Sequence, residues 1–380
     1  MFFNNSIHLG RVSGIMISID YSWFLIFALF VFLLGQGYLP VVAPGQPVGW
    51  YWTIAVFTSL LFFASVLAHE MSHALVARRS HIPINNITLF IFGGVSQMED
   101  EPPTAGDEFK MAIAGPLASV GVAIIFFGVS LLSVVAQSRL LFAAFTYLWF
   151  INIFLAIFNM LPGFPLDGGR VFRAALWQWT GNLERSTHIA SLTGQTFGFL
   201  FIFIGVGSLF FPVLRNYGGI WMALVGWFLV SAARNSYQQV VLRESLRHVS
   251  IREVMNPQTS PVPADISIEH LVTDYFLGES SSTLPVEQQG NVVGVVSVED
   301  VRTLPRDEWK YRLVSEIMRP LSEETVLPAD DDAWDAANRM AQSKRDRIIV
   351  ADQNHVEGLV TRGSLLRWLQ THTRLSPGQA

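Results

Sequence analysis

The pattern of hydrophobic and polar positions changes near residue 245. Before that point, long apolar stretches alternate with short polar connections, and a helix needs about 20 apolar residues to cross a bilayer. After it, short apolar segments alternate with polar residues, which is typical of a soluble α/β domain. We predict a six-helix membrane domain over 1–245, with spans at about 21–41, 50–77, 110–136, 140–163, 188–212 and 218–239.

Basic residues in the connections between these spans predict their orientation, because Lys and Arg concentrate on the cytoplasmic side. The connections 78–110 and 164–187 carry three basic residues each, whereas the loop 38–49 has no charged residue. We therefore predict a multi-pass cell-membrane protein embedded in the lipid bilayer. Both termini and the soluble tail lie in the cytoplasm.

The uncharged segment 82–98 is too short and too polar for a lipid-facing helix. Apolar residues alternate at Ile87, Leu89 and Ile91, which favours a strand or hairpin that dips toward the membrane. Irregular backbone at that depth requires surrounding protein or a water-filled cavity. An ordinary cytoplasmic loop is the alternative interpretation.

The second predicted span contains two histidines and one carboxylate: His69, Glu70 and His73. Ionisable groups inside a membrane are costly and usually functional, and 50–77 holds no other acidic or basic residue. His69 and His73 lie one helical turn apart on one face, so they can hold one ion, and Glu70 can reach a water beside it. This arrangement is typical of zinc hydrolases.

The fourth predicted span ends in a stretch that has two prolines and three glycines over 162–169. These residues end the helix around a single carboxylate, Asp167, which is the natural third ligand for a four-coordinate zinc. Asp167 could alternatively cap a turn. Asn159, two turns earlier, could stabilise an oxyanion, shape the site or make an interhelical hydrogen bond.

Composition supports a membrane protein and narrows the metal chemistry. The chain is 51% hydrophobic and 14% charged, which is too apolar for a soluble protein of 380 residues. It has no cysteine, so metal ligands must be His or carboxylate. The net charge is +2 for residues 1–247 and −7 for 248–380, and the acidic tail argues against nucleic-acid binding.

The soluble tail contains an internal repeat with a period of about 63 residues. Each copy follows the order strand–helix–strand–strand–helix, with helices predicted at Ile268–Tyr275 and Ala333–Ala341. We place the first repeat at 246–308 and the second at 309–372, followed by a short tail, 373–380.

These motifs resemble the site-2 protease family of intramembrane zinc metalloproteases (M50 type), over roughly 10–240. The resemblance rests on His69-Glu70-x-x-His73, Phe92-Gly93-Gly94-Val95, Ala114-Gly115-Pro116 and the stretch from Asn159 to Gly169. It implies one Zn²⁺ per chain, held by His69, His73 and Asp167, with Glu70 as the general base.

The tail resembles a tandem CBS module, as in the prokaryotic subgroup of that family. Such modules bind adenine nucleotides through Gly-x-x-Ser/Thr-x-x-Asp, which Gly294, Ser297 and Asp300 match. In the second repeat Thr361 matches, but Ser364 replaces the aspartate. The sequence is therefore more consistent with one ATP or AMP site than with two. A pair that only dimerises or docks is the alternative.

The expected function is cleavage of a peptide bond within or near the transmembrane segment of a single-span membrane protein, modulated by adenine nucleotide. The protein would form a homodimer through its CBS domains. We expect Ile87, Leu89, Ile91, Gly93 and Gly94 to pair with an unwound substrate by strand addition. The competing interpretations are a CBS-regulated transporter and a catalytically inactive membrane-binding protein.

Overall fold

The computed structural model has two compact units, Met1–Val240 and Val241–Ala380, which we describe separately. It describes residues 6–80, 82–91, 93–98, 101–211, 219–256, 261–277, 283–320, 326–342, 347–352 and 355–375. Phe92, the ends of the predicted spans at 212 and 218, and residues 376–380 of the tail lie outside these ranges.

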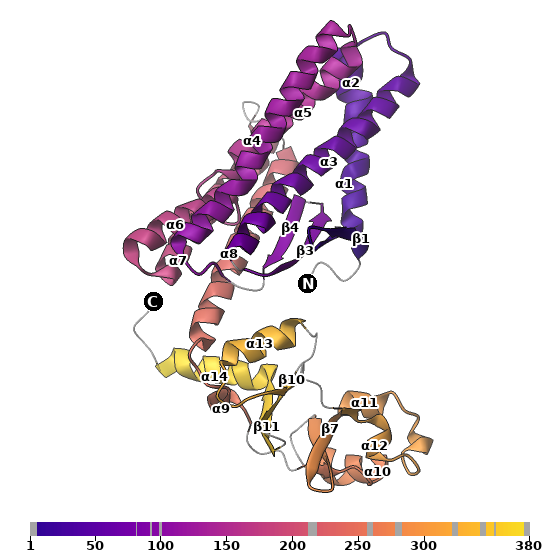
Figure 1. Cartoon of the computed structure of the whole chain (residues 1–380), viewed down its shortest axis with the longest axis vertical. Coiled ribbons are helices and arrows are strands. Elements are labelled where there is room, and N and C mark those ends of the chain that lie inside the picture. The colour runs from indigo at the N-terminus through magenta and orange to yellow at the C-terminus, as the bar shows by residue number, and fades with distance from the viewer. Residues whose placement is uncertain are drawn as a thin grey trace. The chain divides into compact units, whose positions relative to one another are not determined.

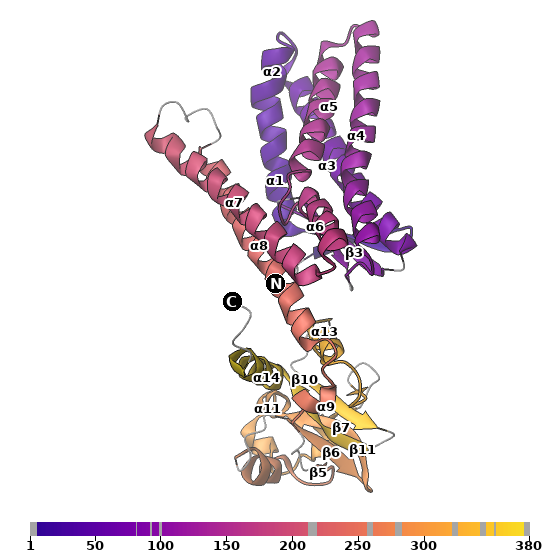
Figure 2. The same cartoon turned by 90° about the vertical axis from the view of Figure 1, so that its left-hand side faces the viewer.

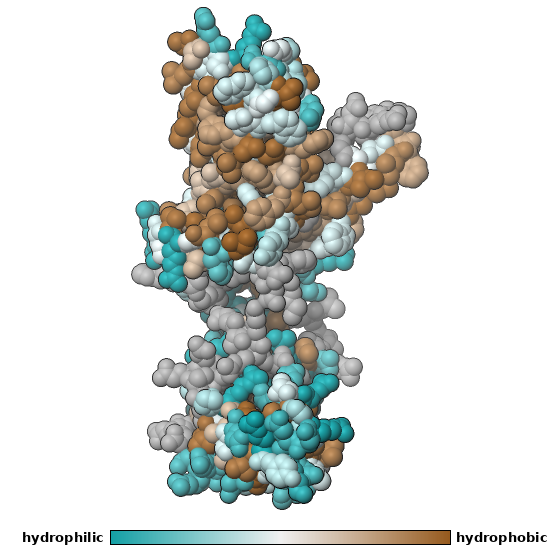
Figure 3. Space-filling model, turned by 90° about the vertical axis from the view of Figure 1, so that its right-hand side faces the viewer, coloured by the Kyte–Doolittle hydropathy of each residue, from teal (hydrophilic) through white to brown (hydrophobic). Residues whose placement is uncertain are grey.

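The first unit is a bundle of long helices (Figures 1 and 2). Apolar side chains cover much of the bundle face seen in Figure 3, as expected for helices in contact with lipid. The helices are α1 (Tyr21–Phe32), η1 (Leu33–Tyr38), α2 (Leu39–Val42), α3 (Val48–Arg79), α4 (Ala105–Val135), α5 (Arg139–Asn159), α6 (Asp167–Thr180), α7 (Leu183–Phe210) and α8 (Gly219–Leu246).

Five of the predicted spans are confirmed as helices long and apolar enough to cross a membrane. They are Tyr21–Val42, Val48–Arg79, Ala105–Val135, Arg139–Asn159 and Leu183–Phe210. The sixth, predicted at 218–239, is helical as α8 but is not among the candidates found in the described residues. Its apolar part, 219–233, is roughly 22 Å long before Arg234, shorter than the hydrocarbon core.

Glycines bring α7 and α8 into close contact, side by side in both views (Figures 1 and 2). A Cβ added at Gly198 would lie 2.8 Å from the Gly226 carbonyl oxygen, and one at Gly226 would lie 2.5 Å from the Gly198 carbonyl oxygen. Small residues that allow backbones to approach are typical of helix pairs in membranes. The two helices therefore pack as a tight pair.

A four-stranded sheet accompanies the bundle, in the order β1-β2-β3-β4. The predicted hairpin is confirmed as β3 (Ile84–Phe90) paired antiparallel with β4 (Gly93–Met98). The sequence did not predict the other hairpin, β1 (Ser6–Val12) with β2 (Ile15–Asp20), which pairs in parallel with β3. Because β3 lies between two partners, β4 is the edge strand on that side of the sheet.

The second unit confirms the predicted repeat order. The first repeat has β5 (Val262–Pro263), α10 (Ile268–His270) continued by η3 (Leu271–Phe276), β6 (Thr283–Gln288), β7 (Asn291–Ser297) and α11 (Val298–Arg302). The second has β9 (Val326–Leu327), α13 (Ala333–Gln342), β10 (Arg347–Asp352), β11 (His355–Thr361) and α14 (Arg362–Leu375). The linking elements are α9 (Ile251–Val254), η4 (Arg306–Glu308), α12 (Val314–Ile317) and β8 (Arg319–Pro320).

The opening segment of each repeat packs in the core of the other. Ile251 and Val254 of α9 belong to the buried cluster of the second repeat, and the backbones of Asn256 and Leu359 exchange hydrogen bonds. Val314 of α12 is buried in the core of the first repeat, and β8 pairs with β7. Each repeat therefore needs a segment of the other repeat to complete its buried core, so the two repeats pack together.

Candidate metal site

The two histidines of α3 and the aspartate of α6 bring three ligand atoms together. His69 and His73 are 3% and 8% exposed, and their Nε2 atoms lie 3.2 Å apart. Oδ2 of Asp167 lies 3.1 Å from Nε2 of His69 and 3.2 Å from Nε2 of His73. The structure thus places the three predicted ligands in one cluster, although Asp167 lies 98 residues from His69 in the sequence.

Helix α4 contacts both imidazoles at their Nδ1 atoms. Nδ1 of His73 lies 2.7 Å from the carbonyl oxygen of Met111, which can only accept a hydrogen bond. Nδ1 therefore carries the proton, and Nε2 presents a lone pair to the cluster. Nδ1 of His69 pairs with Oγ of Ser119 at 2.9 Å, also on α4. Sequence reasoning did not identify Met111 or Ser119, because single polar contacts between distant helices leave no periodic signal.

Gly115 of α4 leaves space beside the Nε2 atoms of both imidazoles. A Cβ at this position would lie 2.1 Å from Nε2 of His73 and 2.6 Å from Nε2 of His69, far inside contact distance. Because glycine has no Cβ, the backbone of α4 can approach its neighbours closely at this position. The close approach here is to the ligand side chains themselves.

The donor set fits a divalent cation with nitrogen and oxygen ligands. Nε2 of His73 and Oδ2 of Asp167 are both acceptors and lie 3.2 Å apart, an arrangement that favours a cation between them, and Nε2 of His69 lies within 3.2 Å of both. Tetrahedral zinc with bonds of about 2.0–2.1 Å would separate its ligand atoms by about 3.3 Å. Among the described residues, these three form the one group of histidine and carboxylate ligands suited to a metal ion.

The glycines after Asp167 explain how its carboxylate reaches the histidines. Asp167 is the first residue of α6, and the N-cap is Leu166, so Asp167 does not serve as a cap. A Cβ at Gly168 would lie 2.3 Å from the carbonyl of Met160, and one at Gly169 would lie 2.3 Å from the carbonyl carbon of Gly163. The first turn of α6 therefore packs directly on the preceding turn of backbone, which only glycine permits.

Glu70 lies against the edge strand of the sheet. A Cβ at Gly94 of β4 would lie 2.4 Å from Cγ of Glu70, so the strand backbone runs directly past this side chain. Ile87 and Leu89 are buried in β3, whose two sides are both hydrogen-bonded to other strands. Strand addition at these two residues is therefore excluded, and the available edge is β4, which begins with Gly93 and Gly94. Ile91 lies in the turn before β4.

Asn159 is the last residue of α5 and is half-buried. Within the part of the chain that the structure describes, no hydrogen bond joins it to His69, His73 or Asp167. Its predicted role near the metal ligands therefore stays a prediction.

In the tail, the first-repeat signature forms a closed hydrogen-bonded cap at the start of α11. Oδ2 of Asp300 accepts from the backbone N–H of Ser297 at 3.0 Å, and Ser297 Oγ accepts from the N–H of Asp300 at 3.2 Å. Oδ1 of Asp300 accepts from Nε of Arg319 at 2.8 Å. A Cβ at Gly294 would lie 2.6 Å from the Arg319 carbonyl oxygen, so this glycine lets β8 approach.

The second repeat has the same cap without the carboxylate, and a cavity adjoins it. Ser364 N–H donates to Oγ1 of Thr361 at 3.1 Å, and Ser364 Oγ accepts from the N–H of Thr361 at 3.0 Å. The cavity has a volume of about 260 Å³. Its lining consists of Glu253, Val254, Met255, Asn256, Ser364, Arg367, Trp368 and Thr371.

Comparisons with known proteins agree with this organisation. The model of peptidase family M50 matches residues 57–139 and 133–204, and the CBS domain model matches 251–307 and 314–371. A protein of Synechocystis sp. named as a zinc metalloprotease is 33% identical, over 97% of this chain and 97% of its own. Rip3 of Mycobacterium tuberculosis, similarly named, is 30% identical over 98% of this chain and 95% of its own. The site-2 protease of Methanocaldococcus jannaschii, a solved structure, is 28% identical, with a TM-score of 0.43 over 61% of this chain and 95% of that chain.

Proposed function

Because the chain belongs to peptidase family M50, the zinc metalloproteases of the site-2 protease type, with a tandem CBS module, we propose that His69, His73 and Asp167 hold its Zn²⁺ and that Glu70 is its general base. The convergence of these three ligand atoms at 3.1–3.2 Å carries this proposal. Three protein ligands would leave a bound zinc open to water or substrate, as catalytic zinc requires.

The residues around the ligands then have separate tasks. When bound, zinc polarises the scissile carbonyl and lowers the pKa of a coordinated water toward about 7. Glu70 takes a proton from the attacking water and passes it to the leaving amide nitrogen, so that one carboxylate serves as base and then as acid. Met111 and Ser119 keep the imidazole lone pairs directed at the cluster. Asn159 is a neutral donor for the developing oxyanion or for shaping this region.

The substrate is a single-span membrane protein that is cleaved within or near its transmembrane segment. A helix hides its carbonyls in its own hydrogen bonds, so the substrate must unwind before water can attack. We place the unwound segment on the edge of β4, because Gly94 of this strand lies against Glu70. A substrate strand there passes beside the general base.

The topology of the membrane domain has six spans, with α8 as the last. Its close glycine packing on α7 supports this assignment, since a partner helix compensates for a short apolar stretch. Both termini and the CBS domains lie in the cytoplasm, and the CBS domains also form a homodimer. A cysteine introduced at Ser250 of this cysteine-free chain then reacts with an impermeant thiol reagent only from the cytoplasmic side.

Zinc content and cleavage measured on one variant test the catalytic assignment. Glu70→Gln keeps all three ligands, so we expect stoichiometric zinc together with a loss of cleavage of about 10²–10⁴-fold. The substrate is a single-span reporter reconstituted with the protein. Full cleavage by this variant would overturn the assignment of Glu70 as base, and zinc-free wild-type protein would overturn the ligand assignment.

The CBS pair binds ATP or AMP and changes the protease rate. The first-repeat site consists of Gly294, Ser297 and Asp300, but Asp300 is paired with Arg319, so a ribose would have to displace that arginine. The cavity beside Thr361 and Ser364 offers Trp368 for stacking and Arg367 for phosphate. A ligand acts through its differential affinity for two arrangements, so rate effects correspond to about 1–3 kcal/mol.

Calorimetry on the full-length protein distinguishes the two nucleotide sites. Asp300→Ala weakens binding if the first repeat holds the nucleotide, whereas Trp368→Ala weakens it if the cavity does. If neither ATP nor AMP binds at millimolar concentration, the tail is a dimerisation or docking module. The zinc site is unaffected by that outcome.

A further inference from the structure

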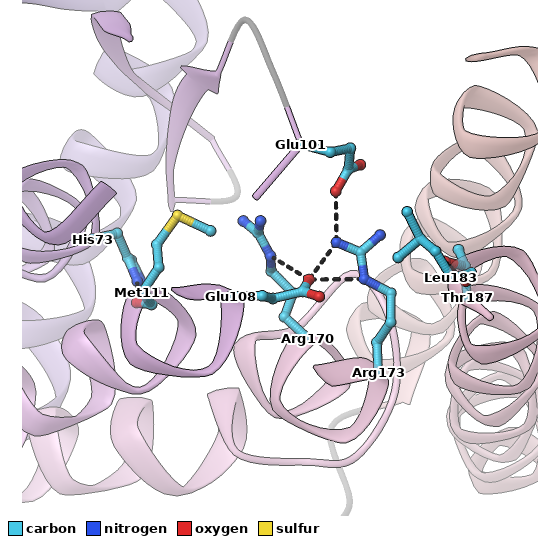
Figure 4. A network of polar contacts seen from close by, with 8 residues as sticks. All are labelled: His73, Glu101, Glu108, Met111, Arg170, Arg173, Leu183 and Thr187. Atoms are coloured by element: carbon cyan, nitrogen blue, oxygen red, sulfur yellow. Dashed lines mark hydrogen bonds and ion pairs between the residues drawn. The ribbon is translucent and has the colours of Figure 1, made fainter. Parts of the chain in front are cut away.

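A buried cluster of two acidic and two basic side chains joins α4 to α6 (Figure 4). We name it the α4–α6 ion cluster; it consists of Glu101, Glu108, Arg170 and Arg173. Nε of Arg173 donates to Oε1 of Glu108 at 2.7 Å, and Nη2 of Arg173 donates to Oε2 of Glu101 at 2.7 Å. Nε of Arg170 lies 3.5 Å from the same Glu108 oxygen.

The centre of the cluster is almost completely removed from solvent. Glu108 is 0% exposed and Arg173 is 2% exposed. Burial lowers the pKa of Arg173, but Glu108 and Glu101 outweigh this effect and raise it above its ordinary value. The guanidinium of Arg173 also lies 5.2 Å from the ring centre of Phe164, in the turn before Asp167. With two carboxylates and two guanidinium groups, the cluster has a formal net charge of zero.

A buried ion pair is a weak source of stability, because desolvation offsets the attraction between the charges. What directed, charge-assisted hydrogen bonds provide is a defined geometry between the elements they join. The cluster therefore contributes a defined geometry between α4 and α6 more than it contributes stability.

The two helices that the cluster joins each control one side of the metal site. Glu108 lies one turn before Met111, whose carbonyl holds His73, and Figure 4 shows these residues on the same helix. Arg170 lies one turn after Asp167 in α6. A shift of α6 along α4 would therefore move Oδ2 of Asp167 relative to both histidines.

We infer that Glu108, Arg170 and Arg173 are positioning residues that set the distance between Asp167 and the two histidines. This inference rests on the proposed zinc site. Zinc tolerates only small departures from its bond lengths, so a loosened joint releases the metal faster. Glu101, the more exposed acidic member of the cluster, connects the segment that follows β4 to Arg173.

The test is the rate of zinc loss to a chelator, measured on the full chain in detergent. Glu108→Gln should accelerate zinc loss by about 10–100-fold, the usual effect of removing a partner that orients metal ligands. Asp107→Asn is the matched control, because Asp107 lies in the same first turn of α4 but pairs with Lys110 and Ser80. This control should leave the rate unchanged.

A second variant separates positioning from folding. Glu108→Gln combined with Arg173→Met leaves neither central charge unpaired, so it should fold with a melting temperature near that of the parent. It should nevertheless lose zinc as fast as the single variant. If it loses zinc at the parent rate, the cluster is only structural and the inference is wrong. Should both buried variants fail to fold, Arg170→Gln decides, because Arg170 is less buried and contacts the same Glu108 oxygen, and an unchanged rate there overturns the inference.

A distance measurement makes the result independent of the metal. Spin labels at Leu117→Cys on α4 and Trp179→Cys on α6, both exposed positions, report the separation of the two helices. Glu108→Gln should broaden the distance distribution, and Asp107→Asn should not. An unchanged distribution contradicts the inference, whereas absence of zinc from the parent protein contradicts the proposed metal site instead.

Discussion

The ligand cluster in the membrane domain and the cap of α11 in the tail are both compact groups of polar side chains, but their atoms differ in kind. In the membrane domain, two imidazole nitrogens and a carboxylate oxygen meet at 3.1–3.2 Å, and Nε2 of His73 faces Oδ2 of Asp167 as acceptor to acceptor. In the tail, Asp300 receives hydrogen bonds from Ser297 and Arg319, so each acceptor already has a donor.

This difference predicts which cluster needs a ligand. Buried acceptors that face one another favour a bound cation, because it removes the repulsion between them. A group of matched donors and acceptors is complete without a ligand and stabilises the helix it caps. We therefore expect substitutions in the membrane cluster to change metal binding strongly, and substitutions in the α11 cap to change local stability modestly.

The largest effect is expected for Asp167→Ala. It removes one of three protein ligands, so zinc affinity should fall by more than about 100-fold, beyond the effect of losing an orienting partner. Metal analysis of the purified protein measures this, with Glu70→Gln as the control that retains zinc. Full zinc content in Asp167→Ala would mean that the third ligand lies elsewhere.

A second strong effect is expected for Gly115→Ala. The added methyl would lie 2.1 Å from Nε2 of His73, so the imidazole must move and zinc affinity should fall by about 10–100-fold. Gly121→Ala on the same helix meets nothing within 4 Å and should retain zinc. Equal zinc content in the two variants would contradict the described contact.

Ser119→Ala should have a smaller effect. His69 keeps its ligand atom but loses the partner of Nδ1, so zinc affinity should fall by about tenfold, measured by competition with a chelator. Ser133→Ala is the control on α4, since that hydroxyl donates within its own helix to the carbonyl of Val129. A larger loss in the control would point to a general effect of α4 stability.

The smallest effect is expected in the tail. Ser297→Ala removes the N-cap of α11, which should destabilise the first repeat by about 1 kcal/mol. Hydrogen exchange of the amides in β7 and α11, measured without nucleotide, reports this change. Zinc content should not change, and a change would show that the two clusters are coupled.

Local sequence patterns predicted the parts of this protein that depend on local geometry. The apolar length of a span and the one-turn spacing of His69 and His73 follow from patterns within one element, and the repeat order of the tail follows from the recurrence of such patterns along the chain. The predicted sixth span is the exception, because α8 is helical but its apolar part is too short for it to be among the candidate spans of the described residues.

Only the tertiary structure decided which distant residues meet. The sequence alone predicted that α3 presents two imidazoles on one face, and it singled out Asp167 as the natural third ligand for a metal held by them. The fold brought Asp167 to the histidines, placed Met111, Ser119 and Gly115 around them, and made β4 rather than β3 the edge strand. The physical reason is that such contacts depend on how whole helices pack, and packing is a property of surfaces assembled from many separated residues.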